Sequence, residues 1–156
     1  MPAPQGPRSG QQRGNPAPHQ AQSGGQPQDS GFARIRFGKP LDPELFNGIA
    51  KEATKLVAAV EDRNRNKSTQ LRRFYDELCL WEMRVAQQPE KFAEYLPFIR
   101  MLNAKVAYAE GRKLVDQNFV RLMHHTLGEV KDTESLAACK LFWEAFMGFY
   151  KQERAD

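Results

Sequence analysis

Apolar residues recur at helical spacing through most of the chain after residue 42. The pattern is clearest over residues 96–113, LPFIRMLNAKVAYAEGRK, which we predict to form one helix. The stripe expected to face the core contains Phe98, Ile99, Leu102, Val106 and Ala109. A second row on the same helix, in steps of three or four residues, contains Met101, Lys105, Tyr108 and Arg112. The helix thus combines a core-facing stripe with a row of two cations and an aromatic ring.

Similar stripes predict helices over residues 43–62, 69–88, 115–130 and 134–153, with a short helical turn around Phe92. The residues expected to cap them are Asp42 (followed by Pro43), Ser68, Thr133 and Ser135. The last helix is rich in aromatic residues, so we expect part of it in the core and part as a contact surface for another protein. No segment alternates like a strand. The predicted fold is all-α, a compact bundle of about five helices.

The start of the chain differs from the rest in composition. Residues 1–31 are dominated by Pro, Gly, Gln and Ser, and they bury too little apolar surface to offset the entropy of ordering, so we predict a disordered low-complexity tail. Residues 32–41, with three apolar side chains around two arginines, form an arm or linker, and residues 42–156 the bundle domain. The tail is either solubilising or a weak RNA tether through Arg8, Arg13, Arg34 and Arg36.

The formal net charge of +4 comes from the first 40 residues, which hold five basic side chains and one acid. The remaining 116 residues hold 18 basic and 18 acidic side chains, so only local clusters argue for nucleic-acid binding. No apolar run approaches the roughly 18 residues of a membrane span, and no secretory signal precedes the domain. We expect Cys79 and Cys139 to be buried thiols in a reducing cytoplasm, with a disulfide as the alternative.

Two basic clusters stand out. The first covers the loop and the first turn of the helix over 69–88, and contains Arg63, Arg65, Lys67, Arg72 and Arg73. The second is the row of Lys105, Tyr108 and Arg112, joined by Arg100 and Lys113. Guanidinium groups bind phosphates in bidentate fashion, and a tyrosine stacks on a base or donates to a phosphate or ribose. The alternative for both clusters is a solvated helix face.

Enzymatic chemistry finds little support. His124 and His125 are adjacent, so on a helix they point about 100° apart and do not chelate one ion. The two cysteines lack the close spacing of a zinc site, and no phosphate-binding loop or nucleophile motif is present. We therefore expect no catalytic residues, no metal, no cofactor and no small-molecule substrate. Ribonuclease activity stays as an alternative that would require one of the two histidines.

Two segments together resemble a known family. KSTQLRRFYDEL, followed about twenty residues later by LPFIRMLNAKVAYAEGR, is similar to the small helical subunit of the type III-A CRISPR effector, the Csm complex. The positions that carry the resemblance are Lys67, Ser68, Leu71, Arg72 and Tyr75, then Leu96, Pro97, Phe98, Leu102, Lys105, Tyr108 and Arg112. The resemblance covers residues 66–150 and leaves out the tail.

The resemblance implies a non-catalytic subunit of the inner filament, placed beside neighbouring copies of itself and against the backbone and large signature subunits. It implies contact with the backbone of guide RNA and target RNA without sequence specificity. The residues expected to contact RNA are Lys67, Arg72, Lys105, Tyr108 and Arg112, with Ser68, Gln70 and Arg73 ranked lower. The two clusters form a single phosphate-tracking surface if their helices pack side by side. The alternative is a protein-binding adaptor, which requires Trp143 and Phe149 of the last helix to be exposed.

Overall fold

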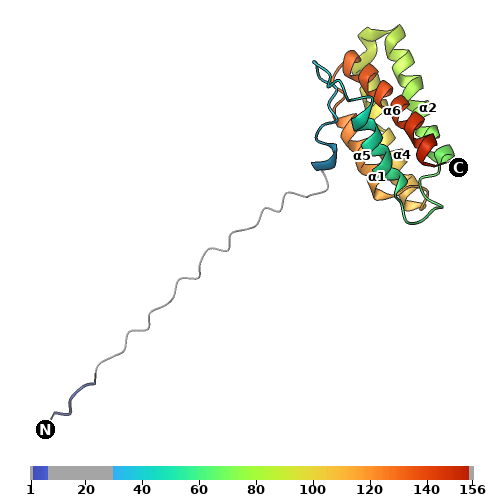
Figure 1. Ribbon diagram of the computed structural model, residues 1–156. Helices are drawn as coiled ribbons and strands as arrows, with labels where there is room; N and C mark the ends of the chain where they lie inside the picture. The colour runs from blue at the N-terminus through green and yellow to red at the C-terminus, as the bar shows by residue number, and fades with distance from the viewer. Residues whose placement is uncertain (1, 7–29, 155–156) are drawn as a thin grey trace.

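The computed structural model describes residues 2–6 and 30–154, and within them the regular structure is helical, with no strand (Figure 1). The α-helices are α1 (Gly48–Ala58), α2 (Ser68–Gln87), α3 (Phe92–Arg100), α4 (Leu102–Gly111), α5 (Gln117–Gly128) and α6 (Thr133–Glu153). Two short 3-10 turns are η1 (Ser30–Phe32) and η2 (Pro89–Lys91). The all-α expectation is confirmed. Most of the predicted tail, residues 1–31, lies outside the described residues.

Helix α6 is the centre of the core. It packs against α1 and α2, whereas α4 packs against α5, and Figure 1 shows α6 (red) lying against α1 (teal) and α2 (green). The fully buried aromatic residues of α6 are Phe142, Trp143, Phe146 and Tyr150. The Trp143 indole N–H donates to Thr126 Oγ1 of α5 at 3.1 Å, which satisfies its polar atom in the core. The adaptor alternative requires Trp143 to be exposed, and this expectation is wrong because Trp143 is buried. Phe149, the other residue that it requires to be exposed, is half-buried.

The first helix is shorter than the predicted range 43–62. The Glu44 carboxylate accepts hydrogen bonds from the Asn47 side-chain amide (3.0 Å) and the Gly48 backbone N–H (3.1 Å), so residues before 48 form turns. Asp42 accepts from the Glu44 N–H at 2.8 Å and does not cap a helix. Leu56 is 41% exposed, because its neighbour Val57 takes the core position.

The predicted helix over 96–113 is two consecutive helices. Helix α3 already begins at residue 92, which places Pro97 inside it and not in its first turn. The chain tightens at Met101, whose carbonyl oxygen accepts from the amides of both Ala104 (3.0 Å) and Lys105 (3.2 Å).

Phe98 lies outside the predicted core stripe, because its neighbour Ile99 takes the core position. It is 53% exposed and stacks on Trp81 of α2 with ring centroids 5.6 Å apart, whereas the other members of the stripe are buried. The predicted cap Ser68 is also wrong, because it stands at the first helical position after Lys67 and makes no cap hydrogen bond. At α6 the cap is Asp132, with Ser135 bonding back to it.

Asn66 joins four parts of the chain. It has a left-handed backbone conformation (φ 56°), which Asn tolerates better than most residues. Its backbone N–H donates to the Leu114 carbonyl oxygen at 3.0 Å, and its side chain donates to the Val57 carbonyl at 3.0 Å. Its Oδ1 accepts from the Asp116 N–H at 2.9 Å. The loop before α2 is thereby fixed to the end of α1 and to the α4–α5 connection.

The C-terminal end of α6 completes this junction. The Tyr150 hydroxyl donates to the Asn66 carbonyl oxygen, and the buried Arg154 guanidinium donates to the same oxygen at 3.2 Å. Arg154 also donates to the carbonyl oxygens of Arg65 (2.7 Å) and Arg63 (2.9 Å). The basic loop is therefore held through its backbone by α6, and its path is fixed before any partner binds.

We predict that Asn66→Ala lowers the free energy of unfolding by about 3–4 kcal/mol. The substitution leaves the buried Val57 carbonyl and the half-buried Asp116 amide without their partner, at about 1–3 kcal/mol each, and adds strain at positive φ. Asn66→Gly is the matched control, because it relieves the strain and should recover about 1 kcal/mol. Urea unfolding measures both. Values for both variants within about 0.5 kcal/mol of wild type would contradict the role of this junction.

The α6 cap gives a pH-dependent prediction. The hydrogen bond from the Ser135 backbone, followed by that from its side chain, holds the pKa of Asp132 below its usual range. A lowered carboxyl pKa contributes stability above the unfolded value of about 3.9, and this is lost as pH falls through the folded pKa. Asp132→Ala should therefore destabilise the protein by about 1 kcal/mol at pH 7 and by less at about pH 3. Thermal unfolding at the two pH values measures this, and an equal loss at both would contradict it.

Candidate nucleic-acid interface

A groove of about 440 Å³ lies between the first half of α2 and α4. The residues that line it are Gln70, Arg73, Phe74, Met101, Ala104, Lys105, Tyr108, Ala109, Arg112 and Leu114. Five of these are among the eight residues predicted to contact RNA, namely Gln70, Arg73, Lys105, Tyr108 and Arg112. The side-by-side packing of the two basic helices is thus present. It brings together residues that lie more than thirty positions apart in the sequence.

The polar side chains stand on the rim of the groove. Lys105 of α4 forms an ion pair with Glu77 of α2, which ties the two helices together across the protein surface. Arg112 lies over the Tyr108 ring at 5.9 Å from its centroid, within the range of a cation–π contact. Tyr108 is 68% exposed. Within residues 2–6 and 30–154, Arg73 is exposed and no ion pair or hydrogen bond engages its guanidinium group.

The floor of the groove is apolar. The pattern of residues along the chain did not predict this apolar floor. Phe74 and Ala109 are buried and Leu114 is half-buried, while Ala104 and Met101 remain exposed. Alanine at position 104, one turn before Tyr108, leaves open the space that a larger side chain would fill. The groove therefore pairs an apolar floor with a cationic rim.

Three predicted residues lie elsewhere. Ser68 and Arg72 line a second groove, of about 360 Å³, together with Thr69 and with Met147 and Lys151 of α6. Arg72 also lies 3.8 Å from Asp76, one turn along α2. Lys67 is exposed at the start of α2 and lines neither groove. The two grooves lie on different sides of α2, and no pattern in the sequence predicted that α6 would contribute to the second.

The remaining cations of the two clusters do not join the groove. Arg65 lies 3.8 Å from Asp62 and donates to the Val115 carbonyl oxygen at 3.4 Å. Arg100 donates to the Val130 carbonyl oxygen at 3.4 Å and therefore points toward the end of α5. Arg100, expected to join the cluster of Lys105, does not line the groove with it.

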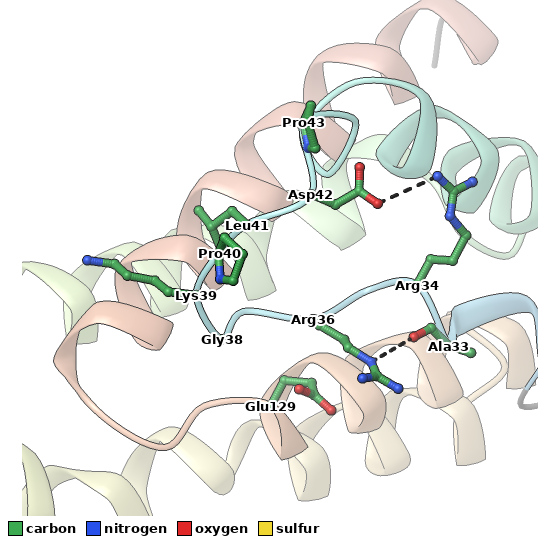
Figure 2. Close-up of a pocket in the computed structure, with 10 residues that line it drawn as sticks. All are labelled: Ala33, Arg34, Arg36, Gly38, Lys39, Pro40, Leu41, Asp42, Pro43 and Glu129. Carbon is green, nitrogen blue, oxygen red and sulfur yellow. Dashed lines mark hydrogen bonds and ion pairs between the residues drawn. The ribbon is translucent and has the colours of Figure 1, made fainter.

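A hollow of about 870 Å³ is formed by residues between 33 and 43 and by Glu129 (Figure 2). Its cations already have partners. Arg34 lies 3.7 Å from Asp42, Lys39 lies 3.1 Å from Glu134, and Arg36 donates to a carbonyl oxygen of the arm at 3.3 Å. Figure 2 shows the first and last of these contacts. Because carboxylates balance its cations, this hollow attracts a phosphate less than the α2–α4 groove does.

The arm packs on the bundle through three buried apolar side chains, Phe32, Ile35 and Phe37. His125 contributes to this packing, since its Nε2 lies 2.9 Å from the Ile35 carbonyl oxygen, whereas His124 is exposed. The described residues contain no group of three His, Cys, Asp or Glu side chains that could hold a metal ion. No described helix is long and apolar enough to cross a membrane.

The cysteines are free thiols, not a disulfide. Cys139 is buried, and its burial raises the pKa of the thiol above its usual value. Cys79 is half-buried beside Tyr75, and burial, with a hydrogen bond to Cys79, raises the pKa of the Tyr75 hydroxyl.

Comparison with known proteins agrees with the resemblance in the sequence. No curated protein and no solved structure gave a significant match. The model of one protein family, described as Csm2 Type III-A, matches residues 43–155, which contain all six α-helices of the described part of the chain. The chain therefore belongs to the Csm2 Type III-A family, the small subunits of type III-A CRISPR complexes.

Proposed function

We propose that this chain is a non-catalytic RNA-binding subunit that contacts the backbone of guide RNA and target RNA in a type III-A interference complex. The observation that supports the proposal best is the groove between α2 and α4. Its lining residues include three cations, Arg73, Lys105 and Arg112, and no carboxylate. The bundle domain as a whole is electrically balanced, so this local excess of positive charge favours an anionic partner.

The rim chemistry suits phosphates. The guanidinium groups of Arg73 and Arg112 can each hold two oxygens of one phosphate, and the Tyr108 hydroxyl can donate a further hydrogen bond. The side chains of Lys105 and Glu77 are 44% and 26% exposed, so their ion pair is still partly screened by water and contributes only about 1 kcal/mol, and a phosphate can replace the carboxylate. Contacts of this kind position an RNA strand without reading its bases. Base pairing between guide and target then supplies the specificity.

The partners under this proposal are guide RNA, target RNA, the backbone and large signature subunits and neighbouring copies of this chain, acting in antiviral defence in the cytoplasm. Contacts with protein subunits have a different surface available. Leu80 and Met83 of α2 and Phe98 of α3 are exposed apolar side chains on the part of the bundle away from the start of α2. The adaptor alternative therefore loses its proposed surface on α6 but not the possibility of protein contacts elsewhere.

Charge reversal in the groove tests the proposal. In the assembled, guide-loaded complex, Arg73→Glu with Arg112→Glu should lower affinity for target RNA by about tenfold or more and flatten the slope of log affinity against log salt by about one per lost phosphate contact. The matched control is Lys51→Glu with Lys55→Glu, which makes the same charge change at exposed positions of α1. This control variant should bind target RNA as tightly as wild type does, because α1 packs against α5 and α6 and is not part of the groove.

All four substituted positions are exposed, so both double variants should keep their unfolding free energies to within about 1 kcal/mol. Electrophoretic mobility shift or fluorescence anisotropy at several salt concentrations measures the affinities. Unchanged affinity of the Arg73/Arg112 variant at every salt concentration, or an equal loss in the α1 control, would overturn the proposal.

A further inference from the structure

Phosphate contacts do not explain one property of the α2–α4 groove, its apolar floor. A strand backbone needs only the cationic rim, yet the floor below it is apolar and partly open to water at Met101, which is 54% exposed. Exposed apolar surface of this kind is costly unless something covers it. The occupant must therefore carry both a negative charge for the rim and a flat apolar face for the floor.

We propose that this groove binds one unpaired nucleotide of an RNA strand, with the base in the groove and the adjoining phosphates on the rim. The inference rests on the proposed RNA-binding function and adds a base contact to it. A volume of about 440 Å³ falls within the range of small-molecule sites, about 300–1,000 Å³. A base that is paired inside a duplex cannot enter, so the site selects unpaired nucleotides.

Each side of the groove has a role toward such a base. Tyr108 supplies the stacking surface, because Arg112 lies over at most one face of its ring and the side chain is largely exposed. Ala104 and Ala109 leave room beside the ring, and Phe74 and Leu114 form the apolar floor. Gln70 offers an amide donor and acceptor to the edge of a base. Stacking on an aromatic ring accepts every base, so the site holds a nucleotide without requiring a particular sequence.

A base contact and a backbone contact are separated by removing bases from the RNA. The probes are a single-stranded RNA about twelve nucleotides long and the same strand with abasic residues at every position, which keeps all phosphates. Binding to the full-length chain at low salt is measured by fluorescence anisotropy. Wild type should bind the base-bearing strand about tenfold more tightly than the abasic strand.

Two substitutions locate the effect in the groove. Tyr108→Ala removes the stacking ring, and Ala104→Trp fills the space at an exposed position without changing any charge. Both should lower affinity for the base-bearing strand by about tenfold and leave the abasic strand within about twofold of wild type. Phe98→Ala, an exposed aromatic outside the groove, should behave as wild type toward both strands. Tyr108→Phe keeps the ring but loses the hydroxyl that donates to a phosphate, so it should weaken binding of both strands equally, by at most about twofold, and keep the preference for the base-bearing strand.

The outcomes distinguish this inference from the proposed function. Equal binding of the two strands by wild type, or equal losses on both strands in Tyr108→Ala, overturns the base site. If Arg73→Glu weakens binding of both strands while Tyr108→Ala and Ala104→Trp change neither, the groove binds backbone only and the proposed function stands. If wild type binds neither strand, the base site is overturned, whereas the proposed function is decided by the charge-reversal variants in the assembled complex.

Discussion

The backbone junction at Asn66 is the constraint on which the functional surface depends. A single left-handed residue bonds to the end of α1, to the α4–α5 connection and, through its carbonyl oxygen, to Tyr150 and Arg154 of the C-terminal segment. It lies directly before Lys67, at the point where α2 begins. The direction in which α2 leaves the loop, and hence the faces that Arg72 and Arg73 present, are set there. Burial of the donors and acceptors makes each of these bonds costly to lose.

The same junction shapes the groove. The Leu114 carbonyl oxygen accepts the hydrogen bond from the Asn66 N–H, and the Leu114 side chain forms part of the groove floor. At the other end, the ion pair between Lys105 and Glu77 joins α4 to α2. The groove is thus built between two points at which these helices are tied, so its rim cations are held close to one another before a ligand arrives. Preorganisation of this kind lowers the entropy lost on binding.

The spacing of residues along the chain predicted the features that depend only on nearby residues. The long stripes of α2, α5 and α6 placed those helices to within a few residues, and the row of Lys105, Tyr108 and Arg112 holds because it depends only on helical spacing. The hydrophobic pattern did not predict where α1 begins, because the Glu44 carboxylate accepts hydrogen bonds there and moves the start of the helix. The hydrophobic pattern did not predict how the helices pack against one another either. Adjacent residues on a helix diverge by about 100°, and nothing local decides that Arg73 turns toward α4 and Arg72 toward α6.

The central claim is that RNA lies in the groove between α2 and α4, and ultraviolet crosslinking of the assembled complex with guide and target RNA tests it most directly. Mass spectrometry of the crosslinked peptides identifies which side chains touch a nucleotide. If RNA lies in the groove, adducts should form on the peptide that contains Tyr108. These adducts should disappear in Tyr108→Phe only if the Tyr108 hydroxyl oxygen is the crosslinked atom. Adducts confined to the arm around Arg34 and Arg36, with none on α2 or α4, would contradict the claim.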